Sequence, residues 1–164
     1  MIILGIDPGY AITGYGVVGY NERSFAVLDY GVIVTGPAKP MPERLLCIST
    51  NISALIDKFK PDTVAVEQLF FNKNVKTALS VGQGRGVAIM TAARAGLRVY
   101  EYTPLQVKQA VAGYGRAAKS QMQQMVRVLL GLPSIPKPDD AADALAVAIC
   151  HAHSYRHCNL DNCR

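Results

Sequence analysis

Four acidic residues lie at the ends of apolar segments, where a charged side chain is unfavourable unless it has a chemical role. Asp7 follows the apolar run IILGI and precedes a Pro-Gly corner, and Glu67 follows the β-branched run TVAV. Asp140 and Asp143 lie at the start of the apolar segment DDAADALAVAI, three positions apart, so a helix would place them on one face. The 164-residue chain has only 12 Asp and Glu residues, which makes acids at the ends of apolar runs informative.

These acids could act together if the chain brings them to one edge of a sheet. Asp7 and Glu67 would emerge side by side if their strands are parallel neighbours, because ligands gather at the carboxyl ends of such strands. Clustered carboxylates repel one another unless cations neutralise them. Oxygen ligands with few His or Cys residues favour Mg²⁺ or Mn²⁺. Two such ions about 3.5–4 Å apart support phosphodiester hydrolysis, so the acids indicate a nuclease.

Each acid also has a purely structural interpretation. Asp7 before Pro-Gly could initiate a turn, and Glu67 could be an exposed loop acid. Asp139 and Asp140 suit a helix start, where capping and the helix dipole favour acids. Asp143 is harder to explain in this way, because it falls inside an Ala-rich apolar helix. The conjunction of the acids, rather than any one of them, favours the metal site.

The elements that must position these acids follow from hydrophobic periodicity and from turn residues. Three strands come first, with short connections that favour antiparallel pairing. Helices and strands then alternate, which predicts an α/β fold with a mixed five-stranded sheet flanked by helices. We expect strands over 2–6, 14–19, 25–34, 63–66 and 97–100. We expect helices over 43–58, 75–95, 104–111 and 139–153, and a further helix that follows the loop GYGRAAKS and ends at 130. Residues 1–155 should form one domain, followed by a polar, disordered tail over 156–164.

The composition agrees with a folded protein that has a polyanionic partner. Half of the residues are hydrophobic and 18% are charged, and 17 Lys and Arg outnumber the acids, with a pI near 9.1. The first apolar run is short and has no basic segment before it, so we expect no signal peptide. No apolar stretch approaches the ~20 residues of a membrane span. These features predict a cytoplasmic protein without a membrane partner.

The cysteines offer one alternative site. Cys47 and Cys150 lie in apolar segments and are predicted to be buried thiols. Cys158 and Cys163, with His153 and His157, could hold zinc, but their spacing does not match a paired C-x-x-C framework. A frayed terminus with free thiols is the favoured interpretation.

Six motifs resemble the RuvC family of bacterial Holliday-junction resolvases, in the family's order. They are GIDPG, TGYGVV, VAVEQLFFNKN, GQGRGVAI, QVKQAVAGYGRAAKSQMQQMVR and DDAADALAVAICH, and they extend from Ile2 to about His153. The resemblance implies an RNase H-like fold and a homodimer that cuts four-way DNA junctions in recombination and repair. It also implies two Mg²⁺ ions per site, with Mn²⁺ able to substitute, products with 5′-phosphate and 3′-hydroxyl ends, and the branch-migration proteins RuvA and RuvB as partners.

The resemblance also implies roles for individual residues. Asp7, Glu67, Asp140 and Asp143 would be the catalytic metal ligands, with Asp139 a helix cap or an outer support for the cluster. The other matches are Phe70 as an aromatic placed against junction bases, Lys108 near the DNA, and Lys119 as a catalytic and DNA-binding cation. Lys73, Lys76, Arg85 and Arg116 could bind backbone phosphates, which would add salt-dependent affinity; for Arg85 a solvated surface role is equally acceptable.

Two segments fit the family pattern less simply. GQGRG is neither a Walker motif nor a dinucleotide-binding fingerprint, and no strand immediately precedes it. We interpret its glycines as sites of close helix packing, at the dimer interface. Tyr10 follows GIDPG where a small polar residue is common in the family, so contacts at that corner should differ.

Three rival functions remain open from the sequence. A sugar-kinase or actin-like ATPase has a similar first strand, but it needs two such domains and an adenosine motif. A related RNase H-like nuclease could act on another substrate, such as an RNA–DNA hybrid. A junction-binding module without catalysis is the third, and the complete acid set argues against it.

Overall fold

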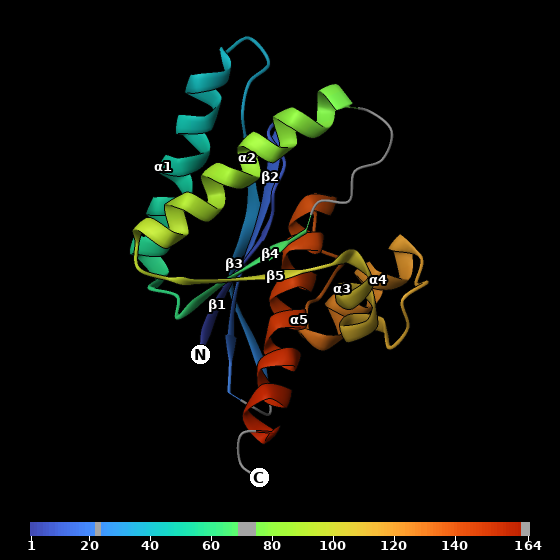
Figure 1. Ribbon diagram of the computed structural model, residues 1–164. Helices are drawn as coiled ribbons and strands as arrows, with labels where there is room; N and C mark the ends of the chain where they lie inside the picture. Colours follow the sequence, from blue (N-terminus) through green and yellow to red (C-terminus); the bar gives the residue numbers. More distant parts are fainter. Residues whose placement is uncertain (22–23, 69–74, 162–164) are drawn as a thin grey trace.

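The sheet is the element that organises the molecule. The computed structural model describes residues 1–21, 24–68 and 75–161, without the side chains of 75–77 and 156–161. Five strands lie in the order β3-β2-β1-β4-β5 (Figure 1). The two pairings among the first three strands are antiparallel, and β1–β4 and β4–β5 are parallel, which confirms the predicted mixed sheet. The strands are β1 (Ile2–Asp7), β2 (Ile12–Tyr20), β3 (Phe25–Val34), β4 (Thr63–Glu67) and β5 (Arg98–Tyr102).

Helices cover both faces of this sheet and create two apolar cores. Figure 1 shows α1 (Met41–Phe59) and α2 (Val75–Arg94) on one side, and α3 (Pro104–Ala112), α4 (Lys119–Leu129) and α5 (Asp139–Asp161) on the other. Leu4, Ile6 and Val66 belong to the core under α1 and α2, whereas Ile3 and Ala65 belong to the core under α5. Successive residues of β1 and β4 thus alternate between the two layers.

The central helix α5 approaches the sheet unusually closely because small residues line the contact. A Cβ atom built on Gly5 of β1 would overlap the Ala144 carbonyl oxygen and would lie 2.9 Å from the Ala148 backbone nitrogen. Ala144 and Ala148 are themselves fully buried. Only a glycine in β1 and alanines in α5 leave room for this backbone separation.

The boundaries differ from the predicted ones mainly at two helices. We predicted that the first helix begins near Glu43, but α1 begins at Met41 and includes Pro42 in its first turn, where the missing N–H is tolerated. We predicted that the last helix ends near His153, but α5 continues to Asp161 and so covers residues 156–161 of the predicted tail. No proline or glycine interrupts this segment. Across the described residues, no helix is long and apolar enough to cross a membrane.

Candidate active site

Asp7 and Glu67 end two neighbouring parallel strands. The last aligned pair of β1 and β4 is Ile6 with Val66, so each acid follows directly at the same edge of the sheet. Each acid lies two positions after a residue that contacts the α5 layer, Gly5 in β1 and Ala65 in β4. Because side chains alternate along a strand, both carboxyl groups face α5. The predicted juxtaposition of these two acids is confirmed.

Helix α5 brings the other two acids to the same edge. Asp140 lies in its first turn, and Asp143 follows one turn later. Burial, followed by the charges of Glu67, Asp143 and Asp140 in that order, raises the pKa of the Asp7 carboxyl to about 7. Burial, followed by the charge of Asp143, likewise raises the pKa of Glu67 to about 7. The four acids therefore share one electrostatic environment, in which carboxylates destabilise one another.

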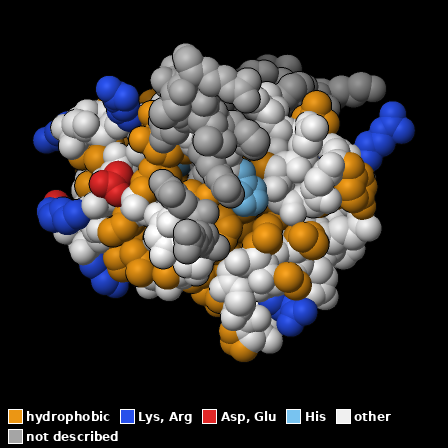
Figure 2. All heavy atoms as spheres, turned by 90° about the horizontal axis from the view of Figure 1, so that it is seen from below, with side chains coloured by type: hydrophobic (Ala, Val, Ile, Leu, Met, Phe, Trp, Pro, Cys, Tyr) orange, Lys and Arg blue, Asp and Glu red, His pale blue; other side chains and the backbone are white. Residues whose placement is uncertain are grey.

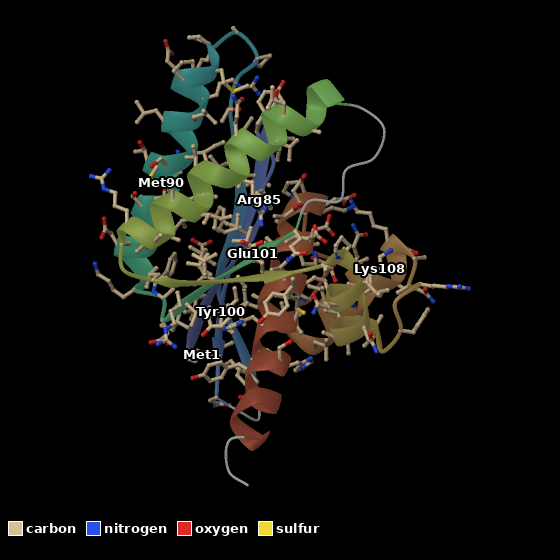
Figure 3. All side chains as sticks on the ribbon, in the orientation of Figure 1. Met1, Arg85, Met90, Tyr100, Glu101 and Lys108 are labelled. Atoms are coloured by element: carbon tan, nitrogen blue, oxygen red, sulfur yellow. The ribbon has the colours of Figure 1, made fainter. Side chains whose placement is uncertain are left out.

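Among the described side chains, two lysines place positive charge beside these acids. Lys119 Nζ, at the start of α4, lies 3.3 Å from Asp143 Oδ2 and 3.4 Å from Asp139 Oδ2. Burial lowers the pKa of Lys119, but the Asp143 and Asp139 carboxylates outweigh this effect and raise it overall. The charge of Lys108 of α3 acts in the opposite direction on Glu67 and lowers the pKa of its carboxyl group. Figure 3 shows Lys108 on α3, to one side of the sheet's end.

Beside these groups lies a cavity of about 200 Å³ that both charged and apolar residues line. Its size and its mixture of acids and lysines suit a phosphate group held beside cations. Its lining residues are Glu67, Pro104, Val107, Lys108, Lys119, Met122, Asp143 and Ala146.

The donor set fits hard divalent cations, although the carboxylates are not in a ligating arrangement. Within the described ranges, no group of three or more His, Cys, Asp or Glu side chains is placed so that it could hold a metal ion as it stands. Oxygen donors and the raised pKa values of Asp7 and Glu67 still match a site that cations would stabilise. At one edge the Lys119 ammonium provides this charge by pairing with Asp143.

Asp139 lies outside this cluster. Its carboxylate pairs with Lys137 at 3.0 Å and with Lys119 at 3.4 Å, and a hydrogen bond from Lys137 contributes most to lowering its pKa. It lies in the first turn of α5, where the helix dipole favours an acid, and its role as a cap or an outer support stays a prediction.

The predicted DNA contacts are only partly visible. Phe70 and Lys73 lie outside the described residues, and the side chain of Lys76 is not described. Arg116 is exposed in the segment between α3 and α4. Arg85 is mostly covered, with 20% of its side chain exposed, and it pairs with Glu101.

The alternative zinc site gains no support from the described residues. His153 Nδ1 lies 3.0 Å from the Ala110 carbonyl oxygen, a contact to α3. The side chains of His157 and Cys158 are not described, and Cys163 lies outside the described residues. Cys47 and Cys150 are free thiols; Cys150 is buried as predicted, and Cys47 is partly exposed.

The sequence did not reveal a buried arginine that supports the corner after Asp7. Arg44 of α1 donates from Nε to Thr35 Oγ1 at 2.9 Å and from Nη2 to the Thr35 carbonyl at 3.2 Å. Its guanidinium carbon lies 4.0 Å from the centre of the Tyr10 ring. The unusual Tyr10 was the one sequence signal that this corner has contacts of its own.

The end of the molecule that carries the N-terminus and the end of α5 differs in its surface from the end that carries the acids (Figure 1). In Figure 2, which looks at the first of these two ends, apolar side chains form several patches among backbone and uncharged side chains, and most of the basic side chains lie near the outline. The acids lie at the opposite end of the strands, where β1 and β4 finish (Figure 1).

An RNase H-like α/β fold with acids at the ends of β1 and β4 and at the start of α5 defines a class of metal-dependent nucleases. The family model described as Crossover junction endodeoxyribonuclease RuvC matches residues 3–151, and the chain belongs to this family. The curated RuvC of Ruminiclostridium cellulolyticum is 62% identical over 156 residues, which cover 95% of this chain and 94% of the relative. The RuvC of Desulfitobacterium hafniense is 63% identical over 154 residues, which cover 94% of this chain and 93% of that one.

A solved structure gives the same assignment. The Thermus thermophilus RuvC in complex with a Holliday junction substrate superposes with a TM-score of 0.92 at 41% identity, and the match covers 96% of both chains. This similarity confirms the predicted family and fold across nearly the whole chain. It also removes the ATPase from the rival functions.

Proposed function

We propose that this chain is a structure-selective endodeoxyribonuclease that resolves four-way DNA junctions by paired, metal-dependent hydrolysis on opposed strands. The observation that carries the proposal is the convergence of Asp7, Glu67, Asp140 and Asp143, with two lysines beside them. Family membership and the junction bound to the Thermus relative support the choice of substrate.

The acids have a direct role in this proposal. Asp7, Glu67, Asp140 and Asp143 would hold two Mg²⁺ ions, or Mn²⁺ in their place. When bound, such ions supply an activated water and stabilise the leaving oxygen. Glu67 and Asp143 face the cavity, where the scissile phosphate would lie. Hydrolysis that releases the 3′ oxygen leaves 5′-phosphate and 3′-hydroxyl ends.

The lysines would respond to the arrival of DNA. Lys119 neutralises Asp143 and Asp139, and its ammonium is close enough to the cavity to turn to an incoming phosphate. Extra negative charge on the phosphate in the transition state would then be stabilised by Lys119 and Lys108. Both roles need the lysines to be protonated, which the raised pKa of Lys119 favours.

The remaining DNA contacts are proposed from the sequence. Lys73, Lys76 and Arg116 would bind backbone phosphates, and Phe70 would stack on or wedge between unpaired bases. Arg85 was predicted as a further phosphate contact. Its guanidinium pairs with Glu101, which leaves it less free to contact a phosphate.

A homodimer would place two active sites on one junction. One face of α2 is exposed and uncharged, and it is formed by Leu79, Gly82, Gln83, Gly86, Met90 and Ala93. Apart from the neighbouring residues and the nearby backbone of α2 itself, no described atom lies within 4 Å of a Cβ built on Gly82 or Gly86, while Leu79 and Met90 are 69% and 50% exposed. Small residues between larger apolar ones allow two helices to approach closely, so we propose this face as the contact with a second copy. Two-fold symmetry would then match two equivalent incisions.

The cellular setting follows from the family. We propose that the chain forms one nuclease domain that includes α5 as far as Asp161, with a role in recombination and repair in the cytoplasm and cooperation with RuvA and RuvB.

Substrate choice is tested by comparing a mobile four-way junction, a linear duplex and an RNA–DNA hybrid in Mg²⁺. Preferential nicking of the junction is expected. Preferential cleavage of the hybrid would favour a related RNase H-like nuclease. Junction binding without nicks in Mg²⁺ or Mn²⁺ would favour a binding module instead.

A further inference from the structure

We propose that Arg85 and Gly84 of α2 are positioning residues that hold the acid-bearing ends of β4 and β1 from the face of the sheet opposite the catalytic cavity. The inference deepens the proposed nuclease function and rests on it. It gives the segment GQGRG a role that neither a phosphate loop nor a surface cation explains.

Arg85 holds the end of β4. Its Nε donates to the backbone carbonyl of Glu67 at 3.4 Å, and its Nη2 pairs with the Glu101 carboxylate of β5. Glu101 is aligned with Val66, whose side chain belongs to the core under α1 and α2. Arg85 and Glu101 lie together between α2 and β5 in Figure 3. One guanidinium thus links three elements at the residue that ends β4.

Arg85 acts on Glu67 through the backbone. The Glu67 carboxyl group faces α5 and lines the cavity, whereas Arg85 reaches the same residue from the α2 side. The next residue is held from β5, because the Gln68 amide donates to the Tyr102 carbonyl at 2.8 Å. Together the two bonds hold the carbonyl and the amide of the Glu67–Gln68 peptide, and therefore constrain the direction in which the Glu67 carboxyl group leaves the sheet.

Gly84 packs closely against the backbone of Gly9 and Tyr10, which form the corner after β1. A Cβ built on it would lie 3.3 Å from the Tyr10 Cα and 3.4 Å from the Gly9 carbonyl oxygen. On its other side Tyr10 is covered by the Arg44 guanidinium of α1. Adjacent residues of α2 therefore contact the segments that follow Asp7 and carry Glu67, so one helix supports both acid-bearing strand ends, which the pairing of β1 with β4 brings together.

A phosphate contact and a positioning residue predict different mutational patterns. Lysine carries the same charge and preserves most phosphate contacts, but it lacks the planar fork that reaches two acceptors at once. If Arg85 binds DNA, the negative charge of Glu101 repels the phosphates and weakens binding. If Arg85 is a positioning residue, Glu101 is needed to orient its guanidinium. Glu101→Gln, Arg85→Lys and Arg85→Gln therefore separate the two roles, and Arg98→Gln, which removes an exposed charge from the other end of β5, is the matched control.

Three measurements on the full chain test the proposal. Junction affinity is measured in EDTA at several salt concentrations, nicking rate is measured against Mg²⁺ concentration, and thermal stabilisation by Mg²⁺ is measured without DNA. We expect junction affinity and its salt dependence to be retained in Glu101→Gln and Arg85→Lys. In these two variants the nicking rate should fall about 10–100-fold, because misplaced ligands lose metal affinity and alignment. The Mg²⁺ concentration at half-saturation should rise in both the nicking assay and the thermal assay. Arg98→Gln should match the wild type.

The opposite pattern would overturn the inference. In that case Glu101→Gln and Arg85→Lys would nick junctions at the wild-type rate. Arg85→Gln would bind junctions more weakly, and the salt dependence of its affinity would fall by about one phosphate contact. This result would make Arg85 a DNA contact. If Arg85→Gln does not fold, Glu101→Gln and Arg85→Lys still decide. If the wild type binds junctions but never nicks them, the proposed function fails, and the thermal assay with Mg²⁺ alone still decides whether Glu101 and Arg85 shape the metal site.

Discussion

Gly14 in β2 touches the backbone of Asp140 at the start of α5. A Cβ atom built on Gly14 would overlap the Asp140 carbonyl oxygen and would lie 3.2 Å from the Asp140 Cβ. Gly14 is itself paired with Asp7 across β1 and β2. The glycine therefore sets how close the first turn of α5 comes to the strand that carries Asp7.

Replacing Gly14 by Ala should displace the start of α5 and impair catalysis. Overlap with backbone cannot be relieved by a side-chain rotation, so we expect a loss of about 1–3 kcal/mol in the free energy of unfolding. We also expect at least a ~10-fold loss of nicking, because the ligands move apart. Gly19→Ala is the control in the same strand, since its Cβ would meet ordinary contacts at 3.6 and 3.8 Å. Equal effects of the two variants on nicking rate and on denaturant unfolding would refute this account.

Asp7→Asn should stabilise the protein when divalent cations are absent. The pKa of Asp7 is raised from 3.8 to about 7, so the folded state keeps a proton that the unfolded state loses. This contribution to stability is present below pH 3.8 and is lost as the pH rises to about 7. At pH 8 the variant should gain on the order of 5 °C in Tm, and near pH 4 it should gain little.

Mg²⁺ should reverse this ranking. It should raise the Tm of the wild type more than that of Asp7→Asn, because only the wild type has the full set of carboxylates to bind it. Equal Tm values at pH 8 in EDTA, or equal stabilisation by Mg²⁺, would contradict the electrostatic role given to Asp7.

His151 should make the fold sensitive to acid. It is 1% exposed, its Nε2 lies 3.0 Å from Thr63 Oγ1, and its Nδ1 lies 2.7 Å from the Tyr102 hydroxyl. Burial lowers its pKa from 6.5 to about 4, so between these values the unfolded state binds a proton that the folded state excludes. Its contribution to stability is thus present above pH 6.5 and is lost as the pH falls towards 4.

This effect is measured by comparison with His151→Gln, because Asp7 and Glu67 titrate in the same range with the opposite sign. The wild type should lose up to about 1.4 kcal/mol per pH unit more than the variant across this window. Denaturant unfolding at half-unit pH steps provides the comparison. Parallel curves for the two proteins would show that His151 does not titrate on unfolding.

Met90→Glu should prevent self-association through α2. The side chain is 50% exposed on the uncharged face defined above, and a dimer would bring two such charges together near its symmetry axis. Analytical ultracentrifugation should find a dimer for the wild type and a monomer for the variant. Val128→Glu, at a 60% exposed position on α4, serves as the control. A monomeric wild type, or a dimer that Met90→Glu leaves intact, would exclude this face as the interface.

The acids could be predicted from the sequence because each one ends or begins an element with a clear hydrophobic pattern. Asp7 and Glu67 end short apolar strands, and the order of elements made these strands parallel neighbours. Asp143 stood out because its helix is otherwise apolar. A local pattern and a topological rule indicated a cluster of acids, whereas the choice of Asp140 over Asp139 and the roles of the four acids rested on the resemblance to the RuvC family.

The supports of the site could not be predicted, because they depend on contacts between distant elements. Gly14 resembles any strand glycine until α5 is docked against it. The pairs Arg85–Glu101 and Arg44–Tyr10 join segments whose separation in sequence gives no periodic signal. For Arg85 in particular, the sequence indicated only a positive charge, whereas the fold shows where its guanidinium is directed.

The central claim is tested most directly by cleaving a synthetic mobile four-way junction in Mg²⁺ and mapping the nicks to the nucleotide. We expect paired nicks at symmetric positions on two opposed strands, with ends that DNA ligase reseals. Asp7→Asn should bind the same junction with unchanged affinity and nick it at least about 10³-fold more slowly, since a metal ligand is lost. Full cleavage by Asp7→Asn, or unpaired nicks spread over all strands and over linear duplex, would contradict the account.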